Sequence, residues 1–240
     1  MKRKLLLFLL VGLALSVAQI QPTPAIASLI IPLNFEYSGG TPPEGDSPWI
    51  TATFDSFAPN TVRLTMAAAN LTDDEFISKW YFNFNPSLEA SFFNFSIYEG
   101  TAIQDPVTLE YYVAPESANN DYKAGPDGKF DLLFNFATSD SANRFGAGET
   151  VIIDLIYPPR AIGEGDFDFF SESQPPPDDK GPFRSAAHIQ GIGPDNAKSG
   201  WIADNPNTVP PNPVPEPATM LLLGIGLIGL AGFGRRRIKT

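Results

Sequence analysis

At residues 50–57 the chain reads ITATFDSF, so every second side chain falls on the same face of an extended backbone. Isoleucine, alanine, phenylalanine and serine share one face, and this period of two is typical of a half-buried β-strand. Pro59-Asn60 then supplies a turn, because proline fixes one backbone dihedral and asparagine tolerates tight turns. Residues 61–68, TVRLTMAA, alternate again. The two segments predict a β-hairpin with one buried face.

Short segments of the same kind follow along the body of the chain. We expect further strands at residues 80–85, 91–98, 107–113, 129–136, 150–157, 166–170 and 185–192. A single helical turn is expected at Thr72, because acids follow this N-cap residue. The nineteen phenylalanines favour sheet. The sequence therefore predicts an all-β fold, a single antiparallel β-sandwich or jelly-roll-like domain over residues 28–204.

The composition excludes several classes of function. Nine basic and twenty-six acidic side chains lie between Ser28 and Val214, a net charge of about −17. Such a surface repels phosphate backbones, so we expect no nucleic-acid partner. The chain has no cysteine, which excludes disulfides, thiolate catalysis and cysteine-ligated metals.

The amino terminus has the three parts of a secretory signal peptide. Three of its first four residues are basic, residues 5–17 are apolar, and the small residues Ala25 and Ala27 precede Ser28. The apolar segment is too short for a comfortable permanent membrane span. We therefore predict a signal peptide over residues 1–27, cut between Ala27 and Ser28.

The carboxy terminus has the layout of a membrane anchor. Residues 205–217 contain six prolines and predict an extended linker of about 40 Å. Residues 218–234 are apolar and predict a transmembrane helix, although roughly twenty residues are needed to span a bilayer comfortably. Residues 235–240 form a basic tail, and its guanidinium groups resist passage through hydrocarbon.

The order of these parts carries a resemblance. Pro215, Glu216 and Pro217, a glycine- and leucine-rich span, and then Arg235, Arg236 and Arg237 resemble the PEP-CTERM sorting signal of Gram-negative bacteria and cyanobacteria. The resemblance implies export, contact with the membrane through the helix, and processing by an exosortase-type enzyme. It also implies a place at the cell surface or in an exopolysaccharide matrix, and it leaves open whether the helix is retained. It brings no assigned activity.

One glycine-rich loop is a candidate metal site. Asn120, Asp121, Asp127 and Asp131 supply the hard oxygens that Ca²⁺ prefers. The spacing is not that of an EF-hand, and Asp127-Gly128 between two strands is also a common hairpin turn. Both interpretations stay open, and no other cofactor is expected.

A catalytic site is not expected. His188 is the only histidine, and no Gly-x-Ser-x-Gly elbow supplies a serine nucleophile for it. The twenty-six acids guarantee that some pair lies close together, so a pair of carboxylates is poor evidence for a glycosidase. A hydrogen-bonded structural histidine is the alternative that we favour.

Three tryptophans are candidates for stacking against sugars: Trp49, Trp80 and Trp201. Indole faces pack against the C–H surfaces of pyranose rings as they do against other apolar planes. Packing in the core or at the rim of the sheets is the alternative for all three.

The sequence as a whole predicts a secreted, surface-sorted structural or adhesive protein of the cell envelope or exopolysaccharide matrix. The alternative is a carbohydrate-binding module, assisted by calcium and bound to polysaccharide.

Overall fold

The computed structural model describes residues 28–99, 109–113, 122–126, 128–139, 141–172 and 180–205. The predicted signal peptide (1–27), nearly all of the linker (205–217), the sorting helix (218–234) and the basic tail (235–240) lie outside these residues.

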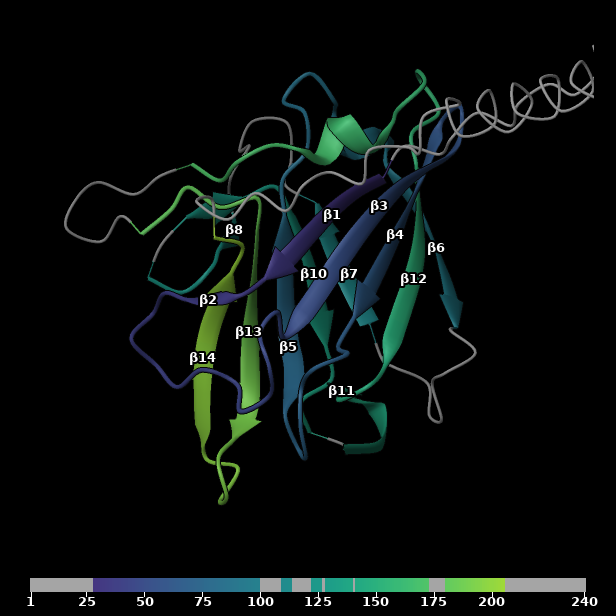
Figure 1. Cartoon of the computed structure of the whole chain (residues 1–240). Coiled ribbons are helices and arrows are strands. Elements are labelled where there is room, and N and C mark those ends of the chain that lie inside the picture. Colours follow the sequence, from purple (N-terminus) through teal and green to yellow (C-terminus); the bar gives the residue numbers. More distant parts are fainter. Residues whose placement is uncertain are drawn as a thin grey trace, which may run out of the picture.

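The predicted hairpin is the centre of the first sheet. Its two strands are β3 (Ile50–Ala58) and β4 (Thr61–Ala67), paired antiparallel as expected. The sheet has the order β1-β3-β4-β12-β6 (Figure 1). Its other strands are β1 (Ser28–Leu33), β12 (Thr150–Ile156) and β6 (Asn94–Glu99), and every neighbouring pair is antiparallel.

The second sheet is also antiparallel and has the order β2-β14-β13-β5-β10-β7. Its strands are β2 (Phe35–Glu36), β14 (Lys198–Ala203), β13 (Ser185–Ile192), β5 (Phe76–Phe82), β10 (Leu132–Phe136) and β7 (Leu109–Val113). The short β11 (Phe145–Gly146) also pairs with β5. A separate two-stranded ribbon joins β8 (Tyr122–Lys123) to β9 (Lys129–Phe130).

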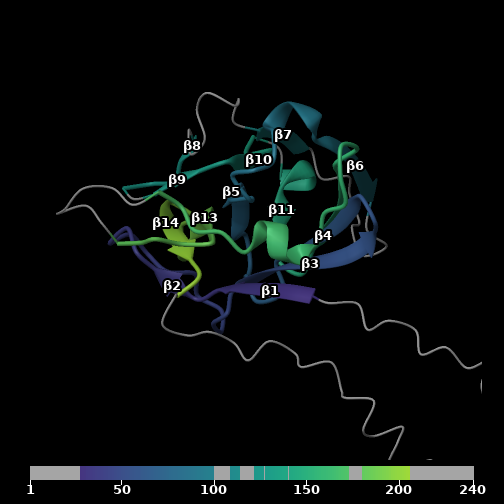
Figure 2. The same ribbon diagram turned by 90° about the horizontal axis from the view of Figure 1, so that it is seen from above.

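The two sheets share one core rich in aromatic rings. Phe54 of β3 contacts Phe82 of β5 edge to face, with ring centroids 5.3 Å apart. Phe54 also stacks on Phe167, at 4.7 Å, and all three side chains are buried. Viewed from above, the strands of both sheets surround this common interior (Figure 2). The structure confirms an all-β fold of antiparallel sheets.

A smaller cluster covers the outer face of the second sheet. Tyr81 of β5 and Ala186 of β13 point away from the main core and pack with Phe130 and Phe183. The β8–β9 ribbon and the segment before β13 supply these covering residues. Trp201 lies at the edge of the cluster. Both faces of this sheet are therefore packed in the region of β8 and β9.

Two local predictions are wrong. The segment expected to be a strand at 166–170 contains the end of a 3-10 helix, η3 (Glu164–Phe167), which buries Phe167 at one end of the core. The helical turn expected at Thr72 is a tight turn that leads directly into β5.

The helices of the described residues are short. They are the 3-10 segments η1 (Ala90–Phe92), η2 (Ser141–Asn143) and η3, each of three or four residues. None has the length and apolar character that a membrane span requires.

Candidate functional site

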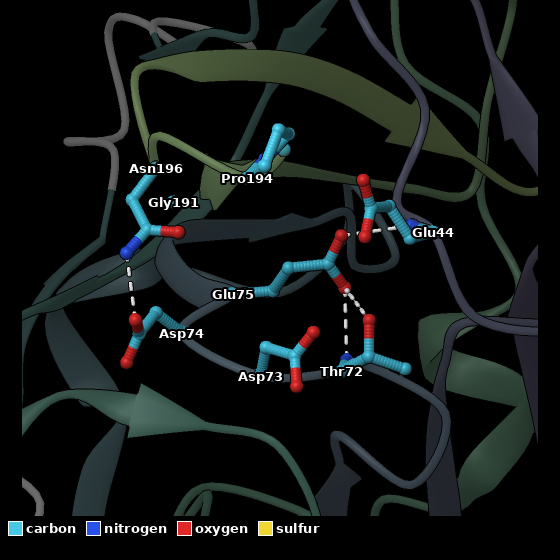
Figure 3. A pocket seen from close by; sticks show the side chains of 9 residues that line it. Glu44, Thr72, Asp73, Asp74, Glu75, Gly191, Pro194 and Asn196 are labelled. Atoms are coloured by element: carbon cyan, nitrogen blue, oxygen red, sulfur yellow. Dashed lines mark hydrogen bonds between the residues drawn. The ribbon is translucent and has the colours of Figure 1, made fainter.

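An acidic hollow lies where the turn before β5 meets the β13–β14 hairpin (Figure 3). Its volume is about 390 Å³, and it is lined by Glu44, Thr72, Asp73, Asp74, Glu75, Gly191, Gly193, Pro194 and Asn196. Four of these nine residues carry carboxylates. The hollow therefore offers oxygen ligands and a negative field to a cation.

Glu75 is the buried member of this group, with 2% of its surface exposed. Its Oε1 accepts a hydrogen bond from the backbone amide of Glu44 at 2.8 Å. Its Oε2 accepts bonds from the amide of Thr72 at 2.9 Å and from the Thr72 hydroxyl at 3.4 Å (Figure 3). Both carboxylate oxygens of Glu75 therefore hold backbone in place.

Asp74 connects the turn to the hairpin on the other side of the hollow. Its Oδ2 accepts a hydrogen bond from Asn196 Nδ2 at 2.6 Å. Gly191 lies against the Asp74 carbonyl so closely that a Cβ atom would overlap it. Among the described residues, no three His, Cys, Asp or Glu side chains are grouped as metal ligands. At the hollow, the turn before β5 is thus attached to the β13–β14 hairpin.

The sequence did not predict this hollow. The acids after Thr72 predict a helical turn, and no motif singles out Gly191 or Asn196. Three consecutive acids directly before a strand were the available signal.

The structure describes one of the four predicted calcium ligands, Asp131. Asn120, Asp121 and Asp127 lie outside the described residues. Asp131 is buried between β9 and β10, and its Oδ2 accepts a hydrogen bond from the amide of Phe84 at 3.2 Å. Gly128 has a φ of +75° and accepts a bond from the amide of Ala124 at 3.3 Å. This geometry agrees with the hairpin-turn alternative, and calcium binding stays a prediction.

The tryptophans do not form an exposed sugar platform. Trp80 is fully buried, and its Nε1 donates to Ser185 Oγ at 2.8 Å. Trp49 is 8% exposed, and its Nε1 donates to the Gly45 carbonyl at 2.9 Å. Both indoles are buried members of the core cluster, which agrees with the core-packing alternative.

Trp201 is partly buried, and neighbouring residues also pack against its ring. The His188 imidazole stacks on it with centroids 4.5 Å apart. Gly125 lies against the same indole, because a Cβ atom at Gly125 would be 2.8 Å from Trp201 Cγ. A sugar that stacked on the face occupied by His188 would have to displace the imidazole.

The sorting residues Pro215, Glu216, Pro217 and Arg235–Arg237 lie outside the described residues, so sequence comparison alone addresses them. The family model described as the PEP-CTERM protein-sorting motif matches residues 213–237. The chain carries a PEP-CTERM sorting signal. No curated protein and no solved structure matches the chain.

The PEP-CTERM signal sets the location of the protein. It marks an exported protein that an exosortase-type enzyme processes and that reaches the surface or associates with the membrane. The predicted cleavage residues Ala25 and Ala27 lie outside the described residues, whereas Ser28 is the first residue of β1.

His188 is held by its neighbours. Its Nδ1 is 2.9 Å from Ser78 Oγ, and Ser78 is buried. Gln190 Nε2 lies 3.4 Å from the same nitrogen. Burial, together with the positive charge of Lys79, lowers the pKa of His188 below 6.5. The site can hold a neutral imidazole, and the serine hydroxyl beside it is closed to a substrate.

Proposed function

We propose that this exported protein is a structural or adhesive component of the cell envelope or exopolysaccharide matrix, without catalytic activity. The observation that carries the proposal is the sorting motif at residues 213–237, which follows an all-β domain. A domain placed at the surface by its own carboxy terminus needs a stable fold and an exposed outer surface, and no reaction has to be assumed.

The packing of the polar side chains supports the proposal. The buried Glu75 holds the turn before β5. His188 stacks on Trp201 and contacts the buried Ser78. These candidates for chemistry are thus occupied in holding strands and turns together.

The acidic surface supports the adhesive part of the proposal. A net charge of about −17 between Ser28 and Val214 keeps the domain hydrated and attracts divalent cations. Such cations can bridge acidic protein to anionic polysaccharide. The carbohydrate-binding alternative is less well supported, because His188 covers Trp201 and the other two tryptophans are buried.

Deleting the gene in the native host tests the proposal. Cohesion of the extracellular matrix and attachment of cells to a surface are measured in the deleted strain and after return of the wild-type chain. We expect both quantities to fall on deletion and to recover with the full chain. Unchanged cohesion and attachment in the deleted strain would exclude a structural or adhesive role.

A second arm separates the carbohydrate-binding alternative. The protein isolated from its host is titrated with purified host polysaccharide, with and without a chelator. Saturable binding to short defined oligosaccharides would favour a binding module. Retention on the intact polymer that disappears with the chelator would favour adhesion through bridging cations.

A further inference from the structure

One row of side chains crosses the outer face of the first sheet. Ser28 of β1 is in register with Asp55 of β3, which is opposite Arg63 of β4. Arg63 is in turn opposite Asp154 of β12, and Asp154 is opposite Ser96 of β6. The five strands lie side by side in this order (Figure 1), so the row runs from one edge of the sheet to the other.

Arg63 is committed to one of its two acidic neighbours. Its Nε donates to Asp154 Oδ1 at 2.7 Å, and its Nη2 donates to Asp154 Oδ2 at 3.0 Å. The hydrogen bond with Asp154 raises the pKa of Arg63, and the Asp154 side chain is 5% exposed. The guanidinium also lies over Phe57, 3.8 Å from the ring centroid. This bidentate geometry orients the Arg63 guanidinium toward Asp154 on β12.

Asp55 lies on the opposite side of Arg63 from Asp154, and its other neighbour in the row is Ser28 of the edge strand β1. The hydroxyl of Ser28 donates a hydrogen bond to Asp55 Oδ1. The row therefore holds two carboxylates and one guanidinium, and its charges alternate from Asp154 to Arg63 to Asp55. A cation at Ser28 would continue this alternation to the edge of the sheet.

The predicted export step creates that cation. Hydrolysis of the Ala27–Ser28 peptide bond by a signal peptidase consumes one water molecule. It leaves a carboxylate on Ala27 and an α-ammonium group on Ser28. The nitrogen and the hydroxyl oxygen of one serine are no more than about 4 Å apart by covalent geometry. The new charge thus arises beside the hydroxyl that already bonds to Asp55.

We propose that Asp55 is the binding site for the α-ammonium group of Ser28 in the processed protein, where this pair closes a row of alternating charges across the first sheet. The proposal rests on the export part of the proposed function. Its consequence is that processing stabilises the edge of β1, the strand that contributes Ile31 and Leu33 to the core.

The test measures the ionisation of the α-amine in protein isolated from its host. A free amino terminus has a pKa of about 7.7–8.0, and a carboxylate within about 4–6 Å raises it. The rate of labelling by an amine reagent is followed against pH on the tryptic peptide from Ser28 to Arg63, which contains no lysine and no other arginine. We expect a pKa of about 8.5 or above in the wild-type protein.

Variants assign the effect to Asp55. In Asp55→Asn the pKa should return to about 8, whereas Asp55→Glu keeps the charge and should keep the raised value. Asp195→Asn is the matched control, because it removes one exposed carboxylate in the β13–β14 hairpin, and it should change nothing. Should Asp55→Asn fail to fold, about 1 M salt should lower the wild-type value by screening.

The outcomes separate the two premises. A mature chain that begins at another residue overturns the processing step and the proposal with it. A chain that begins at Ser28 with an ordinary α-amine pKa, or with a raised value that persists in folded Asp55→Asn, overturns the pairing and leaves export intact.

Discussion

Trp80 is one of the largest side chains that the core buries completely. Its ring stacks on Phe82 with centroids 5.7 Å apart, and its Nε1 bonds to Ser185 in the neighbouring strand. A side chain of this size in a closed core supports both sheets, because close packing leaves no atoms to fill the space it would vacate.

Replacing Trp80 by alanine should lower the free energy of unfolding by about 3–5 kcal/mol, the cost of a large aromatic cavity. Trp201→Ala is the control, since this ring is only partly buried, and it should cost about 1–2 kcal/mol. Urea unfolding followed by circular dichroism measures both values. Equal losses in the two variants would contradict the assignment of Trp80 to the core.

His188 should make stability depend on pH. Its folded pKa lies below 6.5 because of burial and of Lys79, so the unfolded chain binds the proton more readily. Stability contributed by the neutral imidazole is complete above about pH 6.5 and is lost as the pH falls toward and through the folded value. Thermal melts from pH 5 to pH 8 should show this decline.

His188→Gln should flatten that part of the profile. Lys79→Met should reduce the decline, because it removes the positive charge that lowers the pKa of His188. A profile of His188→Gln with the same slope as the wild type would show that other groups cause the decline.

Residue types in the sequence were a partial guide to the sites. The loop at 120–131 has the composition of a calcium site and also of a hairpin turn. Composition cannot tell these apart, because ligand geometry depends on where each carboxylate points. Asp131 illustrates this, since its carboxylate bonds to the amide of Phe84, a residue 47 positions away in the chain.

At the scale of elements, the turn before β5 and the β13–β14 hairpin are joined by close approach. Gly191 has a φ of +76°, and the Asp74 carbonyl occupies the place of a Cβ atom. Only glycine combines this backbone conformation with this proximity.

Gly191→Ala should therefore destabilise the protein by about 2 kcal/mol or more, from backbone strain and steric overlap together. Gly148→Ala separates the two causes, since Gly148 has a φ of +79° but no atom within 4 Å of the added Cβ. It should cost about 1 kcal/mol. Gly165→Ala adds a methyl group in open space without positive φ and should be nearly neutral. Melting temperatures rank the three, and the reverse order would refute this interpretation.

Strands with clear alternation were predictable from the sequence. The hairpin at 50–68 was predictable because its buried side chains recur every second residue. The strand at 28–33 was not predicted because residues 29–33, LIIPL, are apolar without alternation and contain Pro32, which an edge strand tolerates.

The segment at 166–170 was misassigned for a related reason. Its phenylalanines are spaced as in a strand, but the buried Phe167 is anchored by a 3-10 helix. The reason for this conformation is visible only in the folded protein, where Phe167 stacks on Phe54.

In the molecule as a whole, the sorting signal and the β domain have different roles. The domain is the acidic folded part, and residues 213–237 carry the signal that determines where the protein is sent. The sorting signal could be predicted from the sequence because its charge and apolar character follow directly from the order of the residues. The acidic hollow is lined by three separate segments, and the last of them lies more than 110 residues after the other two, so the sequence alone did not reveal it.

Changing Arg235, Arg236 and Arg237 together to alanine should impair retention or processing, because the helix then lacks the charges that stop its passage through the membrane. Cell fractionation with immunoblotting measures the effect. Alanine at Lys123, Lys129 and Lys198, which are exposed on the domain, removes the same charge and should leave the distribution unchanged. Identical distribution of both triple variants would argue against a role for the arginines in sorting.

The most direct measurement is intact-mass analysis of the protein recovered from each fraction of its native host. We expect the chain to begin at Ser28 and to be found outside the cytoplasm, in the membrane or surface fraction. Recovery of the uncut 240-residue chain in the soluble cytoplasmic fraction would contradict the central claim that this is an exported, surface-sorted protein.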